Sequence, residues 1–210
     1  MSAVEAGADG TSDEQPDRRI SEIMSAVDTQ AGTSVGTWVI DPSHTTVEFA
    51  VKHMMITTVK GRFGEVEGKV VGTAEGGWDA DVKISAASID TAAQQRDDHL
   101  RSSDFLDVEN HPHLNFRSRG VNGSFGKPGD RFTVVGDLTI RGTTRQVEFD
   151  TTYEGSGRDP WGGERMSFTA TTKIDRRDFG LTWNQALETG GMLVGNEVKI
   201  NLDVQLVKQD

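Results

Sequence analysis

The chain has 210 residues, no cysteine and a net charge of −11 at pH 7. This length fits one domain with an appendage, and the missing cysteines exclude disulfides, thiolate metal sites and a cysteine nucleophile. An acidic chain lacks the positive field that holds nucleic acid or an anionic membrane, so neither is expected as a partner. There is no apolar run long enough for a transmembrane helix.

Residues 1–35 are small, polar and acidic, which predicts a disordered arm. Apolar residues of the arm recur at the spacing of one helix face at Ile20, Ile23, Met24 and Val27. A helix this short is marginal in water, so it is expected to pack on its own barrel or to fray, and the alternative is a motif that binds a partner. The N-terminus lacks the apolar segment of an export signal, and the sequence therefore predicts a cytoplasmic protein.

From residue 36 to residue 210 the sequence predicts a single β domain. Apolar and polar residues alternate with the period of two that is typical of strands, most clearly at residues 197–206. The same alternation recurs at residues 78–84, 132–140, 147–153 and 166–174, with turn signals between the segments. One-faced strands joined by short turns predict an all-β fold, an antiparallel sheet closed into a barrel or a sandwich of about eight strands.

A polar stretch at residues 94–101 interrupts the β pattern and predicts a short helix. The hydroxyl of Thr91 is expected to cap it, and Asp97 and Arg101 are expected to pair at the i, i+4 spacing. A second short helix is expected near residues 185–189.

Five motifs occur in order along the chain. They are Trp38-x-Ile40-Asp41-Pro42-Ser43-His44-Thr45 with Val47-x-Phe49-x-Val51-Lys52-His53, the segment 96–107, His111-Pro112-His113-Leu114-Asn115-Phe116, the segment 136–142, and Arg176-Arg177-Asp178-Phe179-Gly180. With these motifs, the chain resembles the YceI-like family of bacterial lipocalin-like proteins from about residue 37 to residue 208. The resemblance implies an eight-stranded antiparallel lipocalin-like barrel and a homodimer. It also implies a long apolar guest such as a polyisoprenoid, an isoprenoid-tailed quinone or a fatty amide.

Twelve apolar residues of the predicted strands are expected to point into the barrel and to contact such a guest: Phe49, Val51, Val82, Ile84, Phe116, Val134, Leu138, Ile140, Phe149, Phe168, Val198 and Ile200. An eight-stranded barrel either fills itself with side chains or holds one small ligand, and the resemblance favours the ligand. No cofactor is expected besides a bound isoprenoid-type lipid. The alternative is a side-chain-filled barrel that acts as an interaction or stress-related module.

Arg96 and His99 are the candidates for contacts with a polar head group, because helical spacing places them near one side. The alternative is a helix that only plugs one barrel end. The sequence contains no nucleophile elbow, phosphate loop or dinucleotide fingerprint, so catalysis is not expected. The rival hypothesis is an enzyme with His99 and a nearby aspartate as acid and base. Loss of turnover with retained binding in His99→Ala would favour that enzyme.

The five histidines do not predict a metal site. His111 and His113 would share one strand face, but zinc requires three or four converging ligands. His44 is expected to be a buried hydrogen-bonding residue at the start of a strand. Arg176 and its neighbours Arg177 and Asp178 are interpreted as an ion-pair cluster at a corner.

Overall fold

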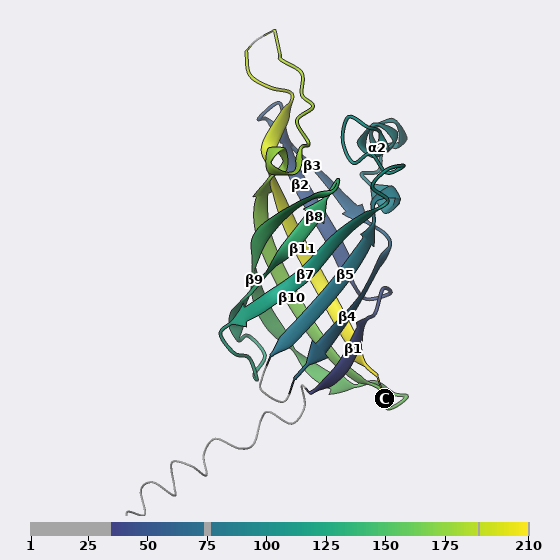
Figure 1. Cartoon of the computed structure of the whole chain (residues 1–210), viewed down its shortest axis with the longest axis vertical. Helices are drawn as coiled ribbons and strands as arrows, with labels where there is room; N and C mark the ends of the chain where they lie inside the picture. Colours follow the sequence, from purple (N-terminus) through teal and green to yellow (C-terminus); the bar gives the residue numbers. More distant parts are fainter. Residues whose placement is uncertain (1–34, 74–76, 189, 210) are drawn as a thin grey trace, which may run out of the picture.

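The computed structural model describes residues 35–73, 77–188 and 190–209. In this part of the chain an antiparallel sheet closes on itself into a barrel (Figure 1). The expected disordered arm and its short helix fall on residues 1–34, outside the described residues, and only Val35 of the arm lies within them.

In chain order, the strands of the sheet are β1 (Gly36–Ile40), β2 (Thr46–His53), β3 (Thr57–Phe63), β4 (Val66–Gly72), β5 (Trp78–Ser85), β6 (Ile89–Asp90), β7 (His113–Asn122), β8 (Arg131–Ile140), β9 (Thr143–Arg158), β10 (Glu164–Asp175) and β11 (Val194–Lys208). The α-helix α2 (Gln94–Arg101) and the short 3₁₀ helices η1 (Ala86–Ser88) and η2 (Arg176–Phe179) complete the elements.

The barrel closes because β11 pairs on both of its sides. The ring runs β1-β4-β5-β7-β8-β9-β10-β11 and returns to β1, with every pairing antiparallel. β11 pairs with β2 along most of its length and with β1 through its last residues, so β1 and β2 lie end to end beside it. On the far side of these two strands, β4 pairs with β1 and β3 pairs with β2. The predicted eight-stranded antiparallel barrel is therefore confirmed. Closure of the ring leaves it with no free edge and turns one face of the sheet inward.

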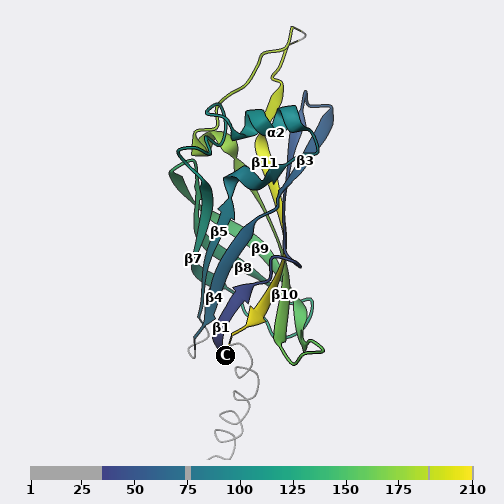
Figure 2. The same cartoon turned by 90° about the vertical axis from the view of Figure 1, so that its right-hand side faces the viewer.

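Aromatic side chains form a cluster around Phe125, in the β7–β8 loop. Figure 1 shows this loop at the barrel end where the C-terminus lies. Phe125 stacks on Phe132 with ring centroids 4.7 Å apart, and it also contacts Trp78, Tyr153 and Phe168 at 5.1 to 5.4 Å. Such edge and offset contacts favour a fixed arrangement of rings. At the opposite end, α2 lies beside the rim of the barrel near β3 (Figures 1 and 2).

The local contacts of α2 differ from those predicted. The helix begins after Ala93 without a side-chain cap, and the hydroxyl of Thr91 donates instead to the carboxylate of Asp97. Asp97 is buried there and also accepts the Thr91 N–H at 2.9 Å, so the expected pair with Arg101 is wrong. Arg101 instead pairs with Asp98 at 3.1 Å, because Asp98 faces the solvent side of the helix.

The prediction of a second helix near residues 185–189 is also wrong for residues 185–188, the part of this range that the structure describes. Residues 185–188 are not helical, and Ala186 forms a β-bridge with Met192. Within the described chain, no helix is both long and apolar enough to cross a membrane.

A polar cluster around Asp41 joins the β1–β2 connection to β10. The Asp41 carboxylate accepts from His44 Nδ1 at 2.8 Å and from the Ser43 N–H at 3.0 Å, and it also binds Arg165. The hydrogen bond from His44, followed by that from Arg165, lowers the pKa of Asp41 to about 2. His44 itself is 61% exposed, so its expected burial is wrong although its hydrogen-bonding role is present.

We expect Asp41 to stabilise the fold above about pH 4 and to lose this contribution as the pH falls toward 2. The sign follows from the lowered pKa, because the folded protein binds this proton less readily than the unfolded chain. A shift from 3.8 to about 2 corresponds to about 2 kcal/mol. Urea unfolding of Asp41→Asn and wild type should therefore differ by about 2 kcal/mol near pH 6 and converge near pH 2. The exposed Asp81 provides the control, and convergence seen equally in Asp81→Asn would contradict the role of Asp41.

Candidate apolar cavity

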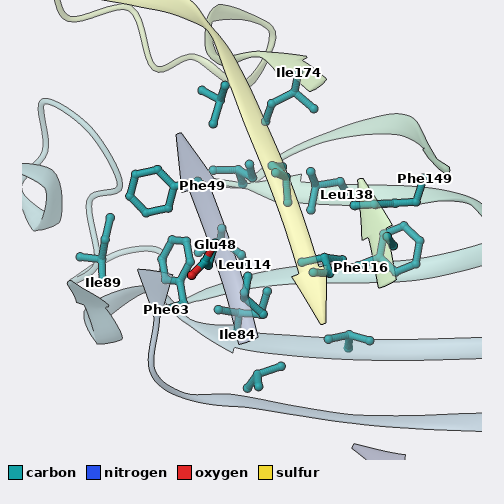
Figure 3. A pocket seen from close by; sticks show the side chains of 18 of the residues that line it. Glu48, Phe49, Phe63, Ile84, Ile89, Leu114, Phe116, Leu138, Phe149 and Ile174 are labelled. Atoms are coloured by element: carbon teal, nitrogen blue, oxygen red, sulfur yellow. The ribbon is translucent and has the colours of Figure 1, made fainter. Parts of the chain in front are cut away.

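A cavity of about 470 Å³ lies inside the barrel between the aromatic cluster and α2. Its wall is built from side chains of all the strands and of the loops near α2. Figure 3 shows side chains such as Phe49, Phe116, Leu138 and Ile174 converging on this space from different strands. The size is that of sites for one small organic ligand.

Strand alternation produces this wall. On β8, residues 132, 134, 136, 138 and 140 face inward, and the residues between them face outward. All twelve residues predicted to point inward line the cavity: Phe49, Val51, Val82, Ile84, Phe116, Val134, Leu138, Ile140, Phe149, Phe168, Val198 and Ile200. Side chains from every part of the ring thus face one common space.

The exposure of these residues shows that side chains do not fill the barrel. Leu138, Ile140, Phe149 and Phe168 are buried, at 5–9% exposure. The other eight are only half-buried, because an inward side chain beside a cavity keeps part of its surface accessible. Native interiors leave few gaps larger than a water molecule, so a cavity of this size is a feature of the fold rather than ordinary packing.

Two inward glycines fix the position of large rings in the wall. A Cβ atom built on Gly136 would lie 2.4 Å from the ring of Phe116, and one on Gly61 would lie 2.4 Å from the ring of Phe49. Each ring therefore occupies the space on a neighbouring strand where a side chain is missing. Phe116 then meets Phe149 edge-on with centroids 5.4 Å apart.

Two ionisable groups of the wall, Arg96 and His99, lie at the α2 end, whereas Glu48, Ser118 and Thr151 line it elsewhere. Arg96 donates from Nε and Nη2 to the hydroxyl and carbonyl oxygens of Thr91, both at 2.7 Å. His99 Nε2 lies 2.9 Å from Asp104 Oδ2, and the His99 ring meets Trp183 edge-on with centroids 4.7 Å apart. Both head-group candidates therefore lie at the cavity end, held by contacts within the protein.

Arg176 is a residue whose role the sequence did not reveal. It is 3% exposed and donates to the carbonyls of Trp183 and Gly195 at 2.9 Å, and also to those of Leu181 and Val194. Burial lowers its pKa, since the charged form is desolvated. The predicted ion-pair cluster is thus wrong for Arg176, which instead joins two residues of the cavity wall, Leu181 and Trp183, to the start of β11.

Of the two arginines, Arg177 forms an ion pair as expected, and its partner is Asp175. Trp183 and Phe105 were also missed as wall residues, because both come from irregular segments where periodicity carries no signal. Their only sequence signal is that large apolar residues stand in otherwise polar loops.

The histidines do not converge. In the described residues, no group of three or more His, Cys, Asp or Glu side chains is placed to hold a metal ion. His111 precedes β7 and lies 4.0 Å from Asp107, whereas His113 begins the strand.

A closed antiparallel barrel with an apolar interior and a helix over one end defines a lipocalin-like architecture. Comparison with known proteins gives the particular family. The model of the YceI-like domain matches residues 38–206, and the chain belongs to this family.

Similar proteins agree with this assignment. A UPF0312 protein of Staphylococcus epidermidis is 34% identical over 168 residues, which cover 79% of this chain and 94% of that protein. The crystal structure of BcnA from Burkholderia cenocepacia has the same fold, with a TM-score of 0.67, 23% identity and coverage of 79% and 98% of the two chains. A domain from Saccharophagus degradans described as polyisoprenoid binding has a TM-score of 0.62, 12% identity and coverage of 82% and 98%.

Proposed function

We propose that this protein binds one long-chain apolar lipid inside its barrel and carries or stores the lipid without changing it chemically. The observation that supports this most strongly is the cavity of about 470 Å³, whose wall along most of its length is apolar. The similar Saccharophagus degradans domain, described as polyisoprenoid binding, supports an isoprenoid-type guest. A polyisoprenoid, an isoprenoid quinone or a fatty amide has the shape and polarity that such a wall accepts.

Transfer of the tail from water would supply the affinity. Each methylene buried in an apolar site contributes about 0.8 kcal/mol, so ten of them supply about 8 kcal/mol, the free energy of a micromolar dissociation constant. Association and ordering offset part of this gain. A tail longer than ten carbons is therefore required for tight binding, which favours isoprenoids over short acyl chains.

The guest is expected to lie with its polar end toward α2. The end near the C-terminus is lined by a cluster of aromatic rings, whereas Arg96 and His99 line the α2 end. Polar groups at one end of an apolar site fix the orientation of a ligand. No cofactor is required by this function, and the proposed assembly is a homodimer, which sedimentation at micromolar concentration tests.

We expect affinity to rise with the length of the tail. Fluorescence of cis-parinaric acid should increase on binding, and alcohols of one, three and four isoprene units should displace it with about tenfold better affinity for each added unit. A polyether of matched length provides the polar control and should not compete. Failure of the protein to take up the probe, or equal competition by the polyether, would contradict the proposal.

A further inference from the structure

A small apolar surface lies at the α2 end of the barrel, outside the cavity. Four exposed side chains form this surface, the mouth lip: Met54, Met55, Ile56 and Met192, with exposed fractions from 40% to 76%. The β2–β3 turn and the segment before β11 are joined there, since the Met54 N–H donates to the Leu193 carbonyl at 2.7 Å. His53 and Leu193 line the cavity, so the lip is continuous with the cavity wall.

The backbone of the lip shows that folding alone does not favour methionine at these positions. Met54 and Met55 have φ angles of 53° and 58°, in the left-handed region that glycine and asparagine adopt with the least strain. Tight β-turns with two such residues normally contain Asn-Gly. The chain instead presents apolar side chains to the solvent from a strained turn, which indicates a contact outside the barrel.

Positive charge lies behind the lip. The chain has a net charge of −11, but residues 49–64 contain no acidic side chain. They contain three side chains that are positively charged at pH 7: Lys52, Lys60 and Arg62. Arg62 pairs with Asp90, whereas Lys52 and Lys60 are exposed and form no ion pair with the described residues. An apolar tip with lysines just behind it matches a phospholipid surface, where acyl chains lie beneath the phosphates.

We propose that the mouth lip inserts into the interfacial region of a phospholipid bilayer, from which the cavity takes up or releases its guest. This inference rests on the proposed function, because it names the surface where a water-insoluble guest is exchanged. A second copy of the chain fits the lip less well, since a stable protein interface uses about 20–30 residues a side. The lip has four apolar residues, three in the β2–β3 turn and one, Met192, in the segment before β11. The acidic net charge favours a zwitterionic surface over a strongly anionic one.

Flotation of the full chain with phosphatidylcholine vesicles tests the proposal. Wild type should float with the vesicles, and the double variant Met55→Asp, Ile56→Asp should reduce the bound fraction by about tenfold or more. The matched control is Trp161→Asp, because Trp161 is 89% exposed and lies in the β9–β10 loop at the other barrel end. This control should float like wild type.

A second variant separates membrane contact from a role in folding. Met54→Asn with Met55→Gly supplies the residues that the turn prefers, so the thermal midpoint should rise while vesicle binding falls. Wild-type vesicle binding in either double variant would overturn the proposal, as would a wild type that does not float. A third outcome is also possible: wild type is an oligomer that does not bind vesicles, and the lip variants are monomers. This result would overturn the proposal and would assign the lip to a subunit interface instead.

Probe uptake in vesicle-free buffer keeps the two proposals distinguishable. Uptake without flotation would overturn the membrane lip alone, whereas flotation without uptake would overturn the proposed lipid binding.

Discussion

Replacement of Val134 by tryptophan is expected to weaken lipid uptake by about a hundredfold while the barrel stays folded. Val134 is half-buried in the cavity wall and packs against both of the buried clusters in the barrel, so it lies near the middle of the cavity. An indole at this position would occupy the space of about four methylenes of the guest. The free energy of binding would then be weaker by about 3 kcal/mol, since each buried methylene contributes about 0.8 kcal/mol. The free energy of unfolding should change by less than about 1 kcal/mol, because the ring enters the cavity and does not overpack the core.

The neighbouring Val135→Trp is the matched control. Val135 lies on the same strand, pairs with Glu148 on β9 and faces away from the cavity. Titration with cis-parinaric acid should give wild-type affinity for this variant. Equal loss of uptake in both variants would show that the effect is not steric exclusion from the cavity.

Replacement of Arg176 by methionine is expected to lower the free energy of unfolding by about 3 kcal/mol. The buried guanidinium donates to four backbone carbonyls between Leu181 and Gly195. Methionine retains the apolar stem and removes every donor, so buried carbonyls lose hydrogen bonds to a charged group. Hydrogen exchange should therefore accelerate in residues 181–188, a segment whose Leu181 and Trp183 line the cavity.

Arg177→Met is the control for this prediction. Arg177 is adjacent in sequence, but its side chain is 57% exposed and pairs with Asp175 at the surface. Exposed ion pairs contribute less than about 1 kcal/mol, so chemical denaturation of this variant should resemble that of wild type. Similar losses in the two variants would contradict the role assigned to Arg176.

The alternation of apolar residues predicted the barrel and the composition of its wall. Successive side chains of a strand point to opposite faces of the sheet. The apolar residues Phe49, Val134 and Val198 could therefore be placed inside the barrel from the sequence alone. The size of the cavity could not be predicted in this way. It depends on how closed strands are staggered and on where inward glycines such as Gly61 and Gly136 let rings lie.

Contacts made by irregular segments were the least predictable. Phe125 comes from the β7–β8 loop, yet it lies at the centre of the aromatic cluster. Arg176 has the sequence neighbours of a surface ion pair, but barrel closure surrounds it with carbonyls. Asp97 was assigned a helix partner and instead binds Thr91, which is six residues earlier and buried. In each case the partner is fixed by tertiary structure and not by spacing along the chain.

The most direct test of lipid binding is native mass spectrometry of protein purified without detergent, combined with solvent extraction of the same sample. We predict a discrete added mass that is released into the solvent as a long apolar molecule with a polar end. A protein of bare mass that also fails to take up an isoprenoid alcohol would contradict lipid binding and would favour a role as an interaction module.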